Sequence, residues 1–364
     1  MRGRGVVFTA PEQAGLEEIM LSPDDLRTGE ALVRSQYSLV SAGTEGSFFT
    51  NLMAETPPVY RGGRTAPPGT IYPARTGYGH LGEILAVGPD PAGVKPGERV
   101  LTFSRHASVV RANVGRFALP VPADADGRRA VFTRMAGVSI TALRASSFSA
   151  GDQVVVIGLG LVGNLAAQLF QLAGGDVLGL DPATHRQDLA RACGVTNVAG
   201  SSGDDARMLV QDWTAGNGAR VVVEAVGRSD LLAQAVELAS RHGEVISLGS
   251  PRASYAADLT PMLARIHLLG IKLIGALEWT FPLQDAERAQ HSIIGNYRTL
   301  LRWILDGKLV VDPLRTHVLR PDQCQEAYGG LAHRKDEYLG VVFDWTGESV
   351  DVQSASTDGG VPGD

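Results

Sequence analysis

The stretch from Val154 to Gly163 constrains the fold of this chain more than any other. It joins a run of three valines and an isoleucine, typical of a strand buried on both faces, to the glycine pattern Gly-x-Gly-x-x-Gly. Leucines at helical spacing follow, and then a second apolar run, residues 176–181, ends in Asp181. Strand, tight turn, helix, strand and terminal acid in this order predict a dinucleotide-binding βαβ unit.

Each glycine of the turn has its own role in this prediction. Gly158 permits the tight turn, Gly160 lets backbone N–H groups approach a pyrophosphate, and Gly163 lets helix and strand pack closely. The helix that begins at Leu161 and Val162 adds a partial positive charge directed at the phosphates. These five residues are therefore expected cofactor contacts.

Asp181 lies near the offset of roughly 20 residues expected for an acid that binds the adenosine ribose hydroxyls. A 2′-phosphate beside this carboxylate would be repelled, so NAD(H) is expected in preference to NADP(H). His185 and Arg186 follow closely and temper that preference without reversing it, and Arg186 is itself an expected cofactor contact.

Composition narrows the class of protein. A net charge of −6 provides no basic footprint for a nucleic-acid partner. No apolar run reaches the roughly 18 residues of a membrane span, and the N-terminal apolar stretch is too short for a signal peptide. Cys193 and Cys324 cannot form a disulfide framework or a Cys₄ zinc site. We therefore expect a cytoplasmic protein with a small-molecule substrate and neither nucleic acid nor membrane as partner.

The residue pattern changes along the chain and divides it into two regions. Up to about residue 122, glycine, proline and polar residues separate short β segments, which predicts a β-rich domain: Gly5–Phe8, Glu30–Leu39, His80–Val87, Arg99–Phe103 and Ala107–Val110. From about residue 139 strands and helices alternate, as a parallel sheet with right-handed crossovers requires. Residues 51–75 read as a long functional or mobile loop, and residues 350–364 as a disordered tail.

Further segments extend the pattern beyond the glycine turn: Tyr37–Glu45, Gly77–Gly88, Gly97–Val100, Thr141–Leu143, Glu224–Gly227 and Tyr338–Gly340. On these residues the chain resembles the medium-chain dehydrogenase/reductase superfamily, and within it the zinc-free dehydrogenases grouped with bacteriochlorophyllide dehydrogenase. The resemblance implies an α/β fold in which a β-rich GroES-like catalytic domain, residues 1–138 and 281–349, holds a doubly wound Rossmann domain, residues 139–280. It also implies an NAD(P)-dependent oxidoreductase of the alcohol dehydrogenase type, paired as a homodimer through the last Rossmann strands.

The family's zinc site is where this sequence departs from the pattern. Alcohol dehydrogenases of the superfamily hold a catalytic zinc with residues that fall here on Ala42, Tyr78 and Gly137, and an acid that supports a ligand falls on Gly79. None of these can replace a thiolate, an imidazole or a carboxylate. Too few residues follow Val100 for the family's four-cysteine lobe. We therefore expect no zinc and a metal-independent reaction.

Without zinc, hydrogen-bond donors must stabilise the substrate oxygen. The resemblance places Thr44 where the family's substrate-contacting hydroxyl stands, while the next member of its proton relay, a histidine, falls on Ser47. Tyr78 is expected to donate a hydrogen bond or act as an acid, with filling of the empty zinc pocket as an equal alternative. His80 shares a strand face with Tyr78 in this reading and is either an acid–base or a structural histidine. Glu45 either orients these groups or bonds the backbone of its turn.

Substrate and nicotinamide contacts follow from position alone. Aromatic residues flank the expected cleft and are candidate substrate contacts, with core packing as the alternative: Phe48, Phe49, Tyr60, Tyr72 and Trp279. Thr141, Val226 and Gly249 fall at segment ends expected to meet the nicotinamide half. A sugar, a cyclitol, a polyketide and a tetrapyrrole-like alcohol all stay open as substrates, because loops determine specificity.

The leading hypothesis is an NAD(H)-dependent, zinc-independent hydride transfer between nicotinamide and a secondary alcohol or ketone. Three alternatives remain open. These are a zinc-free enoyl or quinone reductase, a redox-neutral epimerase or lyase with tightly bound NAD, and a non-catalytic nucleotide-binding protein.

Overall fold

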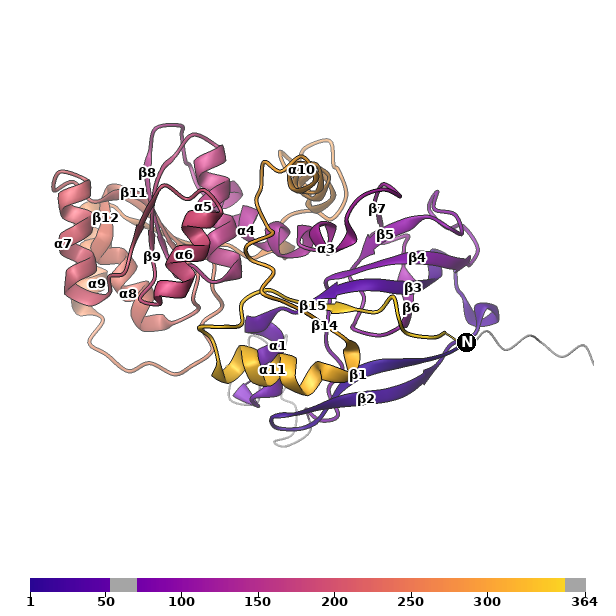
Figure 1. Ribbon diagram of the computed structural model, residues 1–364. Coiled ribbons are helices and arrows are strands. Elements are labelled where there is room, and N and C mark those ends of the chain that lie inside the picture. Colours follow the sequence, from indigo (N-terminus) through magenta and orange to yellow (C-terminus); the bar gives the residue numbers. More distant parts are fainter. Residues whose placement is uncertain (53–70, 351–364) are drawn as a thin grey trace, which may run out of the picture.

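The computed structural model describes residues 1–52 and 71–350 and places two domains side by side (Figure 1). A contiguous central part of the chain forms the Rossmann domain, whereas segments from both ends form the β-rich domain. Tyr60 and the expected tail lie at residues 53–70 and 351–364, outside the described residues.

All strands described in the Rossmann domain run parallel in one sheet. Their order across the sheet is β10 (Asn197–Ala199), β9 (Asp176–Leu180), β8 (Gln153–Ile157), β11 (Ala219–Glu224), β12 (Ala239–Ser247) and β13 (Lys272–Gly275). The first strand in the chain, β8, therefore lies in the middle, and the direction of winding reverses between β8 and β11. This confirms the predicted doubly wound sheet, whose ligands bind at that reversal.

Side-chain alternation along β8 explains why helices cover both faces of the sheet. Val154 and Val156 face one core and Val155 and Ile157 the other. The first core is covered by α4 (Thr133–Ala145), α5 (Leu161–Leu172) and α6 (Thr184–Ala192). The second is covered by α7 (Gly203–Trp213), α8 (Ser229–Leu238) and α9 (Thr260–Leu269).

The β-rich domain is a sheet that joins the two ends of the chain. Its described strands follow the order β14 (His317–Leu319), β15 (Val341–Asp344), β3 (Glu30–Leu39), β4 (His80–Val87), β5 (Arg99–Thr102) and β7 (Leu119–Pro120), with β6 (Val109–Asn113) also paired to β3. The hairpin of β1 (Arg2–Ala10) and β2 (Gln13–Met20) packs beside it. The sequence reading missed β2, because most of its residues are polar or only partly buried.

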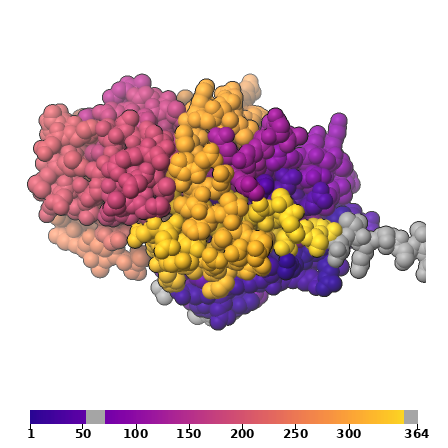
Figure 2. Space-filling view, viewed as in Figure 1, coloured from indigo at the N-terminus to yellow at the C-terminus, as the bar shows by residue number. Residues whose placement is uncertain are grey.

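Further helices lie outside the Rossmann sheet. They are α1 (Ala42–Phe49), α3 (Gly127–Ala130), α10 (Ile293–Leu305) and α11 (Cys324–His333), with short 3₁₀ turns at Pro23–Asp25, Glu278–Thr280 and Pro321–Gln323. Of these, α10 packs on α4, whereas α1 and α11 pack on each other and on the β1–β2 hairpin. Figure 2 shows the C-terminal residues, orange to yellow, as a band between the Rossmann domain and the N-terminal part. The expected domain boundary at residue 139 falls inside α4, which contacts both α5 and α10.

The segment around Thr44, expected as a turn, is helix α1. Helix α10 begins at Ile293, where the Ser292 side chain caps it by accepting a hydrogen bond from Gly295 N. No helix of the described part is long and apolar enough to cross a membrane.

Candidate active site

The glycine turn lies between β8 and α5, at the centre of the Rossmann sheet. Gly158 has a φ of +90°, which a side chain disfavours, and a Cβ on Gly163 would lie 1.8 Å from the Gly158 carbonyl oxygen. A Cβ on Gly160 would meet nothing within 4 Å. Two glycines are therefore demanded by the protein itself, while the third faces open space at the N-terminus of α5. That open cradle fits a pyrophosphate.

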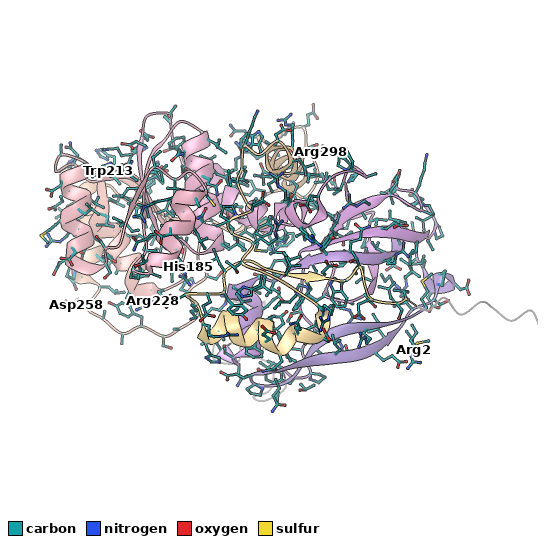
Figure 3. The ribbon with its side chains drawn as sticks, in the orientation of Figure 1. Arg2, His185, Trp213, Arg228, Asp258 and Arg298 are labelled. Atoms are coloured by element: carbon teal, nitrogen blue, oxygen red, sulfur yellow. The ribbon has the colours of Figure 1, made fainter. Side chains whose placement is uncertain are left out.

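Asp181 follows β9 and is bound to the same turn. Its carboxylate accepts hydrogen bonds from Leu159 N at 2.8 Å and Ala183 N at 2.9 Å, and Arg186 Nη1 lies 3.5 Å away. His185 Nε2 and Arg186 Nε are buried without a hydrogen-bond partner among the described residues. Figure 3 shows His185 on the lower side of the Rossmann domain. Unsatisfied polar atoms in the helix that follows Asp181 fit the polar adenosine end of a dinucleotide.

Glu224 lies at the end of β11, the strand on the other side of the point where the winding of the sheet reverses. Its buried carboxylate accepts hydrogen bonds from Val226 N and Gly227 N, both at 2.8 Å. Burial raises the pKa of Glu224, and these hydrogen bonds only partly oppose the rise. A Cβ on Gly249 would lie 2.1 Å from Gly227 N, so the ends of β11 and β12 nearly touch. Glu224 thus holds the loop that contains Val226.

The expected nicotinamide contacts differ in accessibility. Val226 is 45% exposed, whereas Thr141 is 1% exposed and its hydroxyl donates to the Val138 carbonyl oxygen at 2.6 Å. Of these two, only Val226 presents a side chain to solvent, whereas the Thr141 hydroxyl is bonded within α4.

Thr44 lies in the first turn of α1, and Tyr78, just before β4, reaches the residue that precedes this helix. The Tyr78 hydroxyl donates a hydrogen bond to Ser41 Oγ. Thr44 Oγ1 accepts one from Arg252 Nη2 at 3.3 Å, across the domain interface. The Ser47 hydroxyl donates to the Gly43 carbonyl oxygen at 2.6 Å within the helix, so it is not aligned as the next relay member.

Arg134 lies behind Tyr78 and was not among the expected site residues. Its guanidinium is 4.5 Å from the centre of the Tyr78 ring and also lies over Phe103 and Trp279. Nη1 donates to Glu278 Oε2 at 2.7 Å and to the Tyr297 hydroxyl, which itself donates to Glu278 Oε1 at 2.8 Å. Burial alone would lower the pKa of Arg134, but Tyr297 and Glu278 hold it above its usual value. A permanent cation therefore lies under the phenol.

A sequence signal for Arg134 did exist. It is the only charged residue between Ala130 and Leu143 in an otherwise apolar and small-residue segment. A lone charge in such a run indicates a buried partner. The identity of that partner, Glu278, was beyond reach because 144 positions separate the two residues.

The residues at the family's zinc positions do not fit a metal ion. A Cβ on Gly137 would lie 2.2 Å from Tyr297 Cε2, and Tyr78 carries a guanidinium against its ring, which would repel a second cation. Within residues 1–52 and 71–350, no group of three or more His, Cys, Asp or Glu side chains is placed to hold a metal. The donor chemistry at Ala42, Tyr78 and Gly137 is likewise unsuited to zinc.

His80 is a structural histidine, which corrects its place among the acid–base candidates. Its ring is fully buried and bonds Ser35 Oγ at 2.7 Å and Thr102 Oγ1 at 2.9 Å. Burial, together with the nearby His106, lowers the pKa of His80 to about 3. Strand β4 begins only at His80, so the alternation that placed Tyr78 on the same face does not extend to Tyr78.

Glu45 is also part of the fold and bonds neither Tyr78 nor His80. The buried carboxylate accepts hydrogen bonds from Ser41 N, His106 Nε2 and the Tyr328 hydroxyl at 2.6–2.8 Å. Burial alone would raise the pKa of Glu45, but His106, Tyr328 and Ser41 hold it below its usual value. Because Ser41 N is one of its donors, Glu45 supports the segment that bonds Tyr78.

The candidate substrate aromatics separate into two groups. Phe49 is 1% exposed and packs on Phe8 and Tyr328, so it is a core residue and not a substrate contact. Phe48 and Tyr72 are half-buried against the same core. Trp279 is 48% exposed and, with Tyr78, lines a hollow of about 590 Å³.

A family model described as zinc-binding dehydrogenase matches residues 162–285. D-guloside 3-dehydrogenase from Shigella flexneri is 27% identical over 274 residues, covering 72% of this chain and 76% of that protein. L-threonine 3-dehydrogenase from Paraburkholderia phytofirmans is 24% identical, covering 75% of this chain and 83% of its own length.

Solved structures show the same fold at lower identity. An Escherichia coli oxidoreductase/dehydrogenase of unknown specificity superposes with a TM-score of 0.77 at 18% identity, covering 94% of this chain and 99% of that one. The 2R,3R-butanediol dehydrogenase of Bacillus subtilis superposes with a TM-score of 0.75 at 18% identity and the same coverage of both chains.

Proposed function

We propose that this chain, a member of the medium-chain dehydrogenase/reductase superfamily and an NAD(P)-dependent oxidoreductase of the alcohol dehydrogenase type, interconverts a secondary alcohol and its ketone without zinc. The observation that carries the proposal is the pairing of an open dinucleotide cradle at Gly160 with a phenol and a buried guanidinium where the resemblance expects metal ligands. This combination is in keeping with the zinc-free branch to which the sequence is similar.

The cofactor would be held by the glycine turn and by Asp181, with Val226 beside its reactive end. When bound, the nicotinamide accepts or supplies the hydride. Asp181 supports NAD(H) over NADP(H), because its carboxylate would repel a 2′-phosphate. Arg186, 3.5 Å from Asp181, weakens that repulsion without removing it.

Thr44 and Tyr78 are the groups proposed to serve the substrate oxygen. In the direction of ketone reduction, the Tyr78 hydroxyl donates a proton to the carbonyl oxygen. Ser41, the hydrogen-bond partner of Tyr78, is proposed to pass on the proton that replaces it. Thr44 supplies a second hydroxyl for the same oxygen. Arg134 holds the Tyr78 ring in place by stacking on it.

Relatives support an alcohol as the substrate class. Those compared include dehydrogenases named for a guloside and for threonine, both acting at position 3. We propose an alcohol flanked by carbon on both sides, which the hollow beside Tyr78 can accept.

Purified protein tests the proposal directly. Reduction of a panel of ketones is followed by NADH absorbance, and zinc is measured by elemental analysis before and after treatment with a chelator. Turnover is expected to persist without stoichiometric zinc. Replacing Tyr78 with Phe should lower kcat roughly 10²–10⁴-fold, the usual loss for a general acid. Zinc that is required for turnover, or a Tyr78→Phe variant with unchanged kcat, contradicts the proposal.

We also propose that two copies pair along β13. This strand is the outer strand of the sheet, and it leaves Leu273 44% exposed. Leu263 and Leu268 of α9, the helix that precedes it in the chain, are 56% and 68% exposed. An unprotected apolar edge strand is a template for pairing. Leu273→Lys should halve the mass measured by sedimentation, whereas Leu172→Lys, at an exposed leucine of α5, should not. A wild-type monomer would refute pairing.

A further inference from the structure

The hollow beside Tyr78 has the size of a small-molecule site. Its volume is about 590 Å³, and its lining includes Tyr78, the proposed proton donor. Phe103, Phe117 and Trp279 also line it, as do residues of β6. The hollow therefore adjoins both the proposed chemistry and the β-rich domain.

Aromatic rings make the inner wall of the hollow rigid. Phe103 stacks on Phe117 with ring centres 4.0 Å apart and meets Trp279 edge-on at 5.4 Å. The Arg134 guanidinium lies against Tyr78, Phe103 and Trp279 at once. Since Glu278 and Tyr297 hold that guanidinium, the rings are fixed before any ligand arrives, and little ordering cost remains on binding.

Arginines make the rim of the hollow positively charged. Arg105, Arg111 and Arg116 line it, and none of the described residues lining it is acidic. Arg111 Nη2 lies 3.8 Å from Asp25, which neutralises it in part. The guanidinium groups of Arg105 and Arg116 form no hydrogen bond or ion pair within the described part of the chain. Their five-donor forks are thus available to a ligand.

We propose that this hollow is the substrate chamber and that the substrate carries an anionic group, a carboxylate or a phosphate, on an apolar or ring-shaped body. The anion binds Arg105 and Arg116, and the body lies on Phe103, Phe117 and Trp279. Guanidinium groups recognise both anions by paired, charge-assisted hydrogen bonds. The assignment of the bound molecule as a substrate rests on the proposed function, but its binding does not.

Calorimetry with matched probes tests the proposal on the intact protein. The probes are 4-acetylbenzoate, 4-acetylphenyl phosphate and neutral acetophenone, titrated with and without NADH. We expect at least one anionic probe to bind roughly 10-fold or more tightly than acetophenone, and the stronger of the two identifies the preferred anion. Added salt should weaken the anion and leave acetophenone unchanged.

Variants locate the binding. Arg105→Gln with Arg116→Gln should remove roughly 10-fold of the anion's affinity and leave acetophenone unaffected. The control pair, Arg207→Gln with Arg302→Gln, loses the same charge at a partly exposed position of α7 and an exposed position of α10, and should not change the affinity for either probe. Thermal unfolding shows whether each variant is folded, and the salt dependence of the unaltered protein decides independently of any variant.

The outcomes separate this inference from the proposed function. Equal affinity for anionic and neutral probes, or an affinity that the arginine pair does not change, overturns the anion site while ketone reduction can still proceed. Selective anion binding without any NADH-dependent reduction upholds the site and refutes the proposed reaction.

Discussion

The two halves of the proposed site are built in opposite ways. Around Gly158–Gly163 the site consists of backbone: a left-handed glycine, a helix N-terminus and N–H groups held by a single carboxylate. Around Tyr78 it consists of side chains from distant segments, with Arg134 and Glu278 at its centre. In the first half, the closely packed glycines leave no room for a side chain. In the second half, each buried charge needs its partner.

This difference has a thermodynamic side. A backbone site is stabilised by the packing of β8 and α5, whether or not a ligand is present. A side-chain site in a buried setting carries desolvated charges, so the loss of one member leaves another unpaired. We therefore expect mutations in the side-chain half to lower stability. Mutations in the backbone half should change ligand affinity, except at a close contact such as Gly163, where stability should fall.

The largest effect is expected at the buried ion pair. Arg134→Met leaves the Glu278 carboxylate buried without its cation and should cost about 3–5 kcal/mol in the free energy of unfolding, measured with urea. Adding Glu278→Gln should restore much of the loss. Arg298→Met serves as the control, because its ion pair with Asp285 is exposed to solvent, so its loss should change stability little. Equal losses for Arg134→Met and the control would show that the Tyr78 half does not depend on this pair.

Glu45 gives the same half a pH dependence. Its folded pKa is lower than the ordinary value of 4.5, so its contribution to stability is complete above that value and is lost as the pH falls through the folded pKa. Glu45→Gln should cost about 1.5–3 kcal/mol near pH 7, because it removes hydrogen bonds to a charged group, and should flatten the acid limb. Urea unfolding from pH 3 to 7 measures both. An unaltered acid limb in the variant would assign it to other carboxyls.

Substitutions at two glycines of the turn should have different effects, one on stability and the other on cofactor binding. Gly163→Ala forces a Cβ against the Gly158 carbonyl oxygen and should cost about 1–3 kcal/mol of stability. Gly160→Ala has room and an ordinary φ of −60°, so stability should hold while NADH affinity, measured by fluorescence titration, falls. Unchanged NADH affinity in Gly160→Ala would mean that the pyrophosphate does not lie there.

The smallest effect concerns cofactor choice. Asp181→Asn keeps the shape of the side chain and removes its charge, so NADPH should gain roughly 10-fold relative to NADH, equal to about 1.4 kcal/mol. Asp188→Asn, at an exposed acid on α6, is the control. If the ratio of the two dissociation constants stays constant, the repulsion argument for Asp181 is wrong.

What could be predicted from the sequence follows the same division. The βαβ unit, the parallel sheet and the bounds of β3 and β4 could be predicted, because each follows from patterns among residues that are neighbours in the chain. Arg134, Glu278 and Tyr297 meet only through tertiary packing, and no local pattern contains that meeting. Phe49 and His80 were candidates by position alone, and only three-dimensional burial shows that both belong to the core.

Helix α1 shows a third case. Its sequence, with two glycines and a threonine among eight residues, has low helix propensity and reads as a turn. Tertiary bonds override that propensity: Glu45 on the helix is held by His106 and Tyr328. The proposed position of Thr44 is thus determined by contacts that lie 61 and 283 positions along the chain.

The bond between Tyr328 and Glu45, and that between Trp345 Nε1 and Ser38 Oγ, have a consequence for synthesis. While the chain emerges from the ribosome, the strands and helices of residues 153–275 are complete long before Tyr328 and Trp345 appear. The nucleotide-binding half can therefore fold as a unit, since domains generally do so during translation. Strand β3 and helix α1 are made early, yet they complete these bonds only when the last segments have been made. A nascent chain that stops short of residue 328 would hold a folded nucleotide domain tethered to an unfinished one.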